Sequence, residues 1–206
     1  TQLKLYNNFV KKMYQKFKPN FLDTNSKQKI DILRSILNKK KLDGFFIPQS
    51  DKFQGEFLSF YDLRLEWLTG FSGSAGLAVV LKSNAAIFVD GRYEAQLESE
   101  IDKDIFETKQ FSYSNLTEWI NKKITKKKSK LGFDPWLFSV SQLLEIEKNL
   151  KKEISLKGTD NLIDSIWKRN KEKTKKFYVL PKKYSGMNKE DKIKSIVQNF
   201  DDNQEF

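Results

Sequence analysis

The sequence predicts an α/β domain built around a mixed β-sheet. Apolar runs of strand length alternate along the chain with segments of helical periodicity, and the connections between them are of ordinary length. Two of these runs, residues 77–81 and 85–89, are separated only by Lys82-Ser83-Asn84, which is typical of a β-hairpin. Because hairpin strands are antiparallel and strands joined by helices are usually parallel, a sheet that contains both is mixed.

The first elements follow from apolar spacing. Residues 1–24 form a polar and aromatic extension whose partial helical stripe stops near Pro19. Ser26 precedes an amphipathic helix that ends before Gly44. The apolar face of this helix consists of Ile30, Leu33, Ile36 and Leu37. Residues 45–48 then read as a short buried strand.

Residues 49–67 show no clear periodicity, and we expect a long loop with one turn of helix there. Beyond the hairpin we expect helices over residues 93–100, 116–124 (capped by Ser114), 141–150, 161–167 and 189–199, and strands over residues 105–108, 131–133, 153–156 and 177–181. The first domain is expected to cover residues 25–158. Residues 159–206 are expected to hold a linker and the first elements of a truncated second domain.

Two residue types are missing from the composition. The 206 residues include no Cys and no His. Disulfides and thiolate metal sites are therefore excluded, as are a Ser-His-Asp triad and a His-bound zinc. A complete hydrolase is therefore disfavoured. The chain nevertheless folds into a globular domain in this interpretation, because 17 Phe and a hydrophobic fraction of 38% supply enough apolar side chains for a core.

The net charge is +11, and nearly all of the excess is lysine. The runs within residues 39–41, 122–128 and 171–176 are expected to lie on solvated faces, because base recognition usually recruits Arg. Nucleic-acid binding is therefore expected to be weak, salt-dependent and without sequence preference. No apolar segment is long enough to span a bilayer and none has the layout of a signal peptide, so we expect a cytoplasmic protein without membrane contact.

Residues 70–76, GFSGSAG, suggest either a phosphate-binding loop or a loop that only needs small residues. A Rossmann turn places a helix after its glycines, whereas here an apolar strand follows. The phosphate interpretation is therefore rejected. Gly70, Gly73 and Gly76 are instead assigned to positive φ angles and to close backbone approach.

The hairpin is followed directly by Asp90-Gly91-Arg92. Arg92 is either the ion-pair partner of a nearby carboxylate or a binding residue, because α/β proteins often place their sites at strand ends. Paired carboxylates occur at Asp62 with Glu66 and at Asp102 with Asp104. They have no imidazole companion, so we expect them to be solvated, with a two-carboxylate metal site as the remaining alternative.

Residues 48–96, PQSDKFQGEF…RLEWLTGFSGSAGLAVVL…AAIFVDGRYEAQ, resemble the amino-terminal domain of three-domain Xaa-Pro aminopeptidases, a branch of the creatinase-like pita-bread metallopeptidases. Three later stretches agree in order and spacing: LGFDPWLFSVSQ, NLIDSIW and VLPKKYSGMNKEDKI. The resemblance covers roughly residues 30–196. It implies a mixed sheet of about six strands flanked by helices, followed at residues 159–206 by the start of a second creatinase-like domain.

In this family a separate carboxy-terminal domain holds two divalent metals, usually manganese, on Asp, Glu and His ligands. The resemblance therefore implies that this chain, without His, carries no catalytic residue, no metal and no cofactor site. It also implies that the full-length enzyme removes the amino-terminal residue that precedes proline in peptides and is commonly a homodimer. The first partner of this chain would then be its own catalytic domain.

Two site residues follow from the resemblance. Arg92, in the DGRY motif, matches the family position that reaches toward the bound peptide, and a guanidinium fork suits a peptide carbonyl or carboxylate. Phe71 is expected to line the same cleft less directly. The alternative is a stand-alone module of this fold that lacks peptidase activity and uses its basic surface on an acidic partner.

Overall fold

The computed structural model describes residues 25–169 and 176–198, which belong to two compact units, residues 1–170 and 171–206. The expected partial helix before Pro19 lies outside the described residues. The helices of the first unit are α2 (Ser26–Lys40), α3 (Arg64–Thr69), α4 (Glu94–Glu100), α5 (Tyr113–Lys123), α6 (Val140–Asn149) and α7 (Leu162–Ile166). Short 3-10 turns are η1 (Phe60–Asp62), η2 (Gly91–Tyr93) and η3 (Pro135–Leu137).

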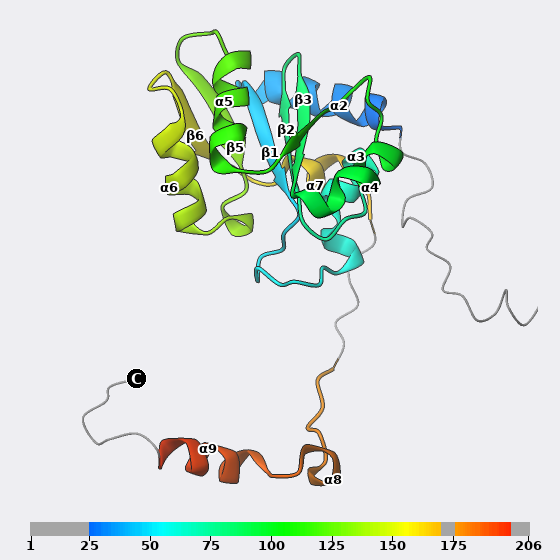
Figure 1. Cartoon of the computed structure of the whole chain (residues 1–206), viewed down its shortest axis with the longest axis vertical. Coiled ribbons are helices and arrows are strands. Elements are labelled where there is room, and N and C mark those ends of the chain that lie inside the picture. The colour runs from blue at the N-terminus through cyan, green and yellow to red at the C-terminus, as the bar shows by residue number, and fades with distance from the viewer. Residues whose placement is uncertain (1–24, 170–175, 199–206) are drawn as a thin grey trace, which may run out of the picture. The chain divides into compact units, whose positions relative to one another are not determined.

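The sheet has six strands, which confirms the predicted mixed α/β fold. They are β1 (Gly44–Pro48), β2 (Leu77–Leu81), β3 (Ala85–Val89), β4 (Glu107–Gln110), β5 (Ser129–Phe133) and β6 (Ile154–Gly158), in the spatial order β4-β3-β2-β1-β5-β6. β2 is antiparallel to both β1 and β3, whereas β3–β4, β1–β5 and β5–β6 are parallel. Five strands therefore run in one direction, and β2 runs against them (Figure 1).

Helices cover both faces of the sheet, and each face has its own apolar core. Alternate side chains of β1 show this division, since Phe45 and Ile47 pack into one cluster and Phe46 into the other. The first cluster includes apolar residues of α2, α3, α4 and α7, and the second includes residues of α5 and α6. All five residues of each of β1, β2 and β3 are buried, which explains their nearly continuous apolar sequence.

The first domain continues past the expected boundary at residue 158. Leu162 and Ile163 of α7 are buried in the first core cluster, and so is Trp167. The ring of Trp167 stacks on Trp67 of α3 with a centroid distance of 5.6 Å. Because these residues complete a core, NLIDSIW is part of the first domain and not of the linker.

Two local expectations change in detail. The fourth strand begins two residues later than expected, at Glu107, because the N–H groups of Ile105 and Phe106 turn back and donate to the carbonyl of Asp102. The cap of α5 is Ser112 instead of Ser114, since the Ser112 side chain accepts a hydrogen bond from the Asn115 N–H.

The second unit contains two helices in its described residues, α8 (Lys182–Ser185) and α9 (Lys189–Val197). The strand expected over residues 177–181 is wrong, because the structure shows no strand there. An apolar run needs a neighbouring strand to complete its backbone hydrogen bonds, and no partner strand is available among residues 176–198. The helix expected over residues 189–199 is confirmed through Val197, and Asn188 caps it by accepting from the Asp191 N–H.

Candidate functional site

The candidate site lies at the edge of the sheet where the five co-directional strands end. The carboxyl ends of five strands lie at this edge, which we call the carboxyl edge: β1, β3, β4, β5 and β6. Loops that leave neighbouring strand ends converge in space, which is why ligands of open α/β sheets bind at such edges. The Asp90-Gly91-Arg92 segment follows β3 at this position.

Arg92 stands on the short turn η2 with its side chain 76% exposed. Its Nη2 lies 2.7 Å from Asp90 Oδ2, and Asp90 Oδ1 accepts from the Arg92 backbone N–H at 2.9 Å. The hydrogen bonds from Arg92 lower the pKa of Asp90, and Asp90 in turn raises the pKa of Arg92. The pair is therefore ionised at neutral pH.

Tyr93 connects Arg92 to the glycine-rich loop. The Arg92 guanidinium lies 5.5 Å from the centre of the Tyr93 ring. Tyr93 Oη is 2.6 Å from Ser74 Oγ, and the Tyr93 ring meets Phe71 edge-on at 5.7 Å. Sequence reasoning did not single out Tyr93, although its place next to Arg92 in DGRY was a usable signal.

Phe71 does not line the surface. Its side chain is 0% exposed and belongs to the first core cluster. The expectation that it contacts peptide is therefore corrected. The ring packs beneath the surface against the glycine-rich loop and against Tyr93. A Cβ on Gly73 would overlap the Phe71 ring, and one on Gly76 would come within 3.2 Å of it, so both glycines serve close packing. Of the three loop glycines, Gly70 has the positive φ, 85°, at the end of α3.

The loop binds a carboxylate of its own chain. Glu100, at the end of α4, accepts from the Ser72 N–H and the Ser72 hydroxyl, each at 2.8 Å. Gln96 Nε2 donates to both Ser72 Oγ and Glu100 Oε1. The two donors of Ser72 are thus occupied by Glu100, in agreement with the rejected phosphate interpretation. Glu100 is a second residue that the sequence alone did not indicate.

A pocket of about 260 Å³ opens at the carboxyl edge beside Asp90. Its apolar wall is made largely by Phe88, Phe111, Leu137, Phe138 and Ile146, and its polar groups come from Gln49, Ser50, Gln54, Asp90, Tyr113 and Gln142. Gln49 donates through Nε2 to the Gly73 carbonyl at 3.2 Å. Its Oε1 is buried and has no hydrogen-bond partner among the described residues.

The loop after β1 forms one wall of this pocket through Gln54 and Gly55. Asp51 Oδ1 accepts from the Phe53 and Gly55 N–H groups at 2.9 Å each, so the loop is fixed by its first carboxylate. It displays Phe53 with 77% of its side chain exposed. The spacing of Asp51 and Gly55 was a turn signal that the sequence analysis left unused.

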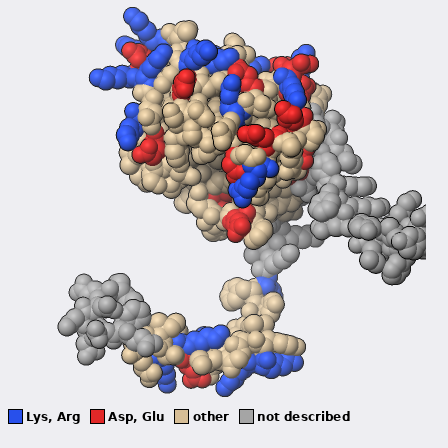
Figure 2. Space-filling view, in the orientation of Figure 1, with Lys and Arg blue, Asp and Glu red and all other residues tan. Residues whose placement is uncertain are grey.

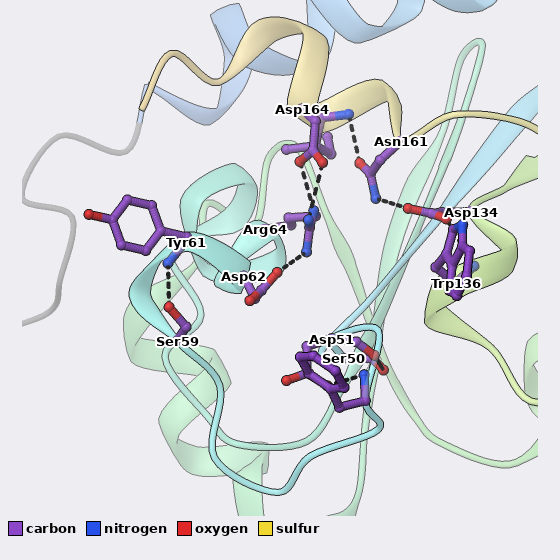
Figure 3. Close-up of polar contacts among 12 residues, drawn as sticks. Ser50, Asp51, Ser59, Tyr61, Asp62, Arg64, Asp134, Trp136, Asn161 and Asp164 are labelled. Carbon is purple, nitrogen blue, oxygen red and sulfur yellow. Dashed lines mark hydrogen bonds and ion pairs between the residues drawn. The ribbon is translucent and has the colours of Figure 1, made fainter. Parts of the chain in front are cut away.

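A polar network holds α7 near this loop (Figure 3). Arg64 donates to both carboxylate oxygens of Asp164, at 2.7 and 3.1 Å, and to Asp62 at 2.9 Å. The other end of α7 is tied by Asn161, which donates to Asp134 at 3.1 Å, and Asp134 also caps the turn that presents Trp136. Trp136 is 73% exposed.

The carboxylate pairs behave differently from one another. Asp62 pairs with Arg64, and Glu66 is only 2% exposed, so the expectation that both are solvated is wrong. Asp102 and Asp104 are exposed, as expected. Among residues 25–169 and 176–198, no three His, Cys, Asp or Glu side chains are grouped so that they could hold a metal ion. No helix in the same ranges is long and apolar enough to cross a membrane.

Sequence comparison identifies the domain. Residues 29–166 match the family model described as the Creatinase/Prolidase N-terminal domain. The chain is 33% identical over 176 residues to Xaa-Pro aminopeptidase 2 of Rattus norvegicus, covering 84% of this chain and 26% of that protein. It is 34% identical over 175 residues to a probable Xaa-Pro aminopeptidase P of Pyricularia oryzae, covering 80% and 28%. The chain thus spans little more than a quarter of these relatives.

Solved structures agree with this result. The X-prolyl aminopeptidase of Caenorhabditis elegans, described as a cytosolic enzyme with a di-nuclear active site, superposes with a TM-score of 0.71 at 25% identity, covering 84% of this chain and 31% of that one. An isolated N-terminal creatinase/prolidase-like domain from Corynebacterium diphtheriae matches 66% of this chain with a TM-score of 0.51 at 24% identity, which supports the fold. The chain belongs to the Creatinase/Prolidase N-terminal domain family, in the form carried by Xaa-Pro aminopeptidases.

Proposed function

We propose that this chain is the non-catalytic amino-terminal part of a metal-dependent Xaa-Pro aminopeptidase, and that its carboxyl edge forms one wall of the peptide cleft. The observation that carries the proposal is the exposed, ionised Arg92, held by Asp90 beside a mixed apolar and polar pocket. A permanently charged, exposed fork suits a peptide carbonyl or a terminal carboxylate.

The pocket next to Asp90 extends this role. Its aromatic wall fits an apolar side chain of the peptide. In this arrangement Arg92 would orient the peptide and the pocket would select among its side chains. Neither group takes part in bond cleavage.

The metal centre would belong to the remainder of the parent enzyme. The residues of this chain do not fit a di-metal site, since the sequence has no His or Cys and its described residues hold no cluster of carboxylates at metal-binding spacing. By extension from the relatives, we expect the full-length protein to use two divalent metals, with manganese as the candidate, to be cytoplasmic, and to form a homodimer. Metal analysis and light scattering of the full-length protein would test these points.

The second unit supports the same assignment. The apolar residues of α9, Ile193, Ile196 and Val197, are more than half exposed. A helix with such an uncovered face normally packs against further structure. We infer that residues 176–198 are the first elements of a second creatinase-like domain that follows the linker.

The test is kinetic and uses the full-length enzyme. Arg92→Ala should lower kcat/KM for an Xaa-Pro peptide by about ten- to a hundred-fold, through loss of one charged hydrogen bond, while metal content stays unchanged. Lys103→Ala is the matched control, because it also removes an exposed cation paired with a carboxylate, Glu98, but lies before β4 at the opposite edge. Equal kcat/KM for wild type and Arg92→Ala would refute the role of Arg92.

The isolated chain gives the complementary result. Purified residues 1–206 should show no turnover of an Xaa-Pro peptide with Mn²⁺, Zn²⁺ or Co²⁺. Activity that persists through a second purification would contradict the assignment. If the full-length protein also lacks peptidase activity, the stand-alone binding module becomes the better description.

A further inference from the structure

Lysines that are scattered along the sequence meet at the edge opposite the carboxyl edge. Nine of them lie at the end of α2, in the β2–β3 turn and in the segments that lead into β5 and β6: Lys39, Lys40, Lys41, Lys82, Lys126, Lys127, Lys128, Lys151 and Lys152. We call this set the lysine edge. All nine are exposed. The expectation that these lysines lie on solvated faces is confirmed, and the fold brings them to one edge. Residues 171–175 of the third lysine run lie outside the described residues.

The topology produces this convergence. The amino ends of β1 and β5 and the carboxyl end of β2 are paired through Gly44, Leu81 and Leu131, and β6 continues the row beside β5. The four neighbouring strands β2, β1, β5 and β6 are spaced about 4.8 Å apart, which gives a row about 14 Å long. Figure 2 shows Lys and Arg side chains gathered at the top of the first unit, above these strand ends.

One carboxylate anchors the middle of the lysine edge. Asp43 Oδ1 lies 3.3 Å from Lys82 Nζ and 3.0 Å from Lys126 Nζ, so the β2–β3 turn and the α5–β5 connection meet at this residue. In the connecting segments 39–43, 82–84, 124–128 and 150–153, the acidic residues are Asp43 and Glu153. With nine lysines, these segments carry a net charge of +7.

Two of the lysines occupy a backbone conformation that favours glycine. Lys41 has φ 55° and Lys128 has φ 59°, and they are two of the three non-glycine residues with positive φ in the described parts of the chain. The left-handed region is unfavourable for a residue with a Cβ, and glycine or asparagine usually fills it at a helix end. A residue with a Cβ at these positions therefore has a cost to folding, which glycine would relieve.

Helix dipoles explain only part of the surface. Lys39 and Lys40 lie in the last turn of α2, where a cation stabilises the carboxyl end of a helix. Lys41 is the C-cap at the same end, whereas Lys82, Lys126, Lys127 and Lys128 lie at least three residues beyond any helix end, so this effect does not account for those four. Within the described residues, no carboxylate lies within 4.0 Å of the side chains of Lys41, Lys127, Lys128, Lys151 or Lys152.

We propose that the lysine edge binds the phosphate backbone of nucleic acid without sequence preference. Lysine is a compact point charge that suits phosphate without base recognition, whereas protein interfaces are depleted of lysine and enriched in arginine and aromatic residues. None of the large apolar side chains exposed in the described part of the first unit belongs to the connecting segments that form this edge. These segments therefore offer no aromatic side chain for base stacking and no apolar side chain for membrane insertion. A row of about 14 Å faces about four phosphates of one strand, at one charge per 3.4 Å.

The test measures binding of the chain to a labelled 20-base-pair duplex by fluorescence anisotropy, for two unrelated sequences. Neutralising about four phosphates predicts a slope of about −3.6 for log affinity against log salt, and hence a loss of about 150-fold between 50 and 200 mM salt. Both sequences should give the same affinity. No binding at 50 mM salt, or a clear preference for one sequence, would overturn the proposal.

Variants locate the surface. Lys41→Gly/Lys128→Gly removes two charges at positions where glycine relieves the backbone, so folding is kept or improved while the salt slope should fall by about two. Lys109→Ala/Lys157→Ala removes the same charge from β4 and β6 away from this edge and should leave the slope unchanged. Equal losses in both variants would show that net charge alone is responsible. Tighter binding to phosphatidylserine vesicles or to polyglutamate than to the duplex would assign the edge to another partner.

Discussion

Replacing Asp164 by Asn tests whether α7 is an integral part of the first domain. Arg64 Nε lies 2.7 Å from Asp164 Oδ1, and Arg64 Nη2 lies 3.1 Å from Oδ2. Arg169 adds a third contact at 2.7 Å. The Arg64 side chain is only 9% exposed, so its charge depends on these acceptors and on Asp62.

The expected loss follows from the partial burial of the pair. Removing one partner of a fully buried ion pair costs about 3–5 kcal/mol, and a hydrogen bond to a charged group contributes about 1.5–3 kcal/mol. The Asp164 side chain is 38% exposed, and Arg64 keeps Asp62. Solvent screening then reduces the expected loss to about 1.5–2 kcal/mol, or about 3–8 °C in melting temperature for a domain of this size.

The stabilisation that Asp164 contributes should depend on pH in a definite direction. Burial opposes ionisation of Asp164, but the hydrogen bonds from Arg64 and Arg169 outweigh it and lower the pKa below 3.8. A carboxyl whose folded pKa is lowered contributes stability above its unfolded pKa and loses it as the pH falls through the folded pKa. The difference between wild type and Asp164→Asn should therefore be full at pH 7 and should shrink below about pH 4.

Urea unfolding at pH 7 and pH 3, followed by tryptophan fluorescence, measures this difference. Two of the four tryptophans, Trp167 and Trp67, stack on each other, so the signal includes the contact between α7 and α3. The matched control is Asp160→Asn, an exposed carboxylate just before α7, which should change stability by less than about 0.5 kcal/mol. Equal stability of Asp164→Asn and wild type at pH 7 would refute both the energetic argument and the extended domain boundary.

Three further outcomes are expected from the same unfolding assay. Phe71→Ala should destabilise the domain by about 3–5 kcal/mol, because the ring is fully buried. A loss of stability below about 1 kcal/mol would contradict the burial of this ring. Glu100→Gln should lower the stability of the domain by about 1–2 kcal/mol by weakening the two hydrogen bonds from Ser72. Unchanged stability would mean that the loop keeps its conformation without Glu100. Arg92→Ala should melt at the wild-type temperature, since its side chain is exposed, and a large drop would make Arg92 structural.

The sequence predicted the central hairpin residue by residue, because both strands are buried on both faces and are joined by a three-residue turn. It was less accurate where local signals compete. Ser112 and Ser114 are both plausible caps, and only the backbone path into α5 decides between them. Residues 177–181 have strand propensity, but propensity without a partner strand forms no ladder.

The site was predictable only where it is local. Arg92 and Asp90 are two residues apart, so their pairing was one of the two readings available from the sequence. The contacts of Ser72 with Glu100 and of Arg64 with Asp164 join residues 28 and 100 positions apart. No spacing rule reaches that far, and the role of Glu66 likewise depends on what surrounds α3 in three dimensions. The domain boundary failed for the same reason, because the core residues of α7 have their partners in α2 and α3.

Glu100 also determines when the glycine-rich loop loses its conformational entropy. A loop whose N–H and hydroxyl donors have no partner in the free protein becomes ordered only when a ligand binds. The entropy lost in ordering that loop then lowers the affinity. Here Glu100 satisfies Ser72 as soon as the chain folds, and Ser74 is already joined to Tyr93 beneath Arg92. If the carboxyl edge is the cleft wall proposed above, association with it resembles docking onto a rigid template, and differences in affinity among ligands should appear in their dissociation rates.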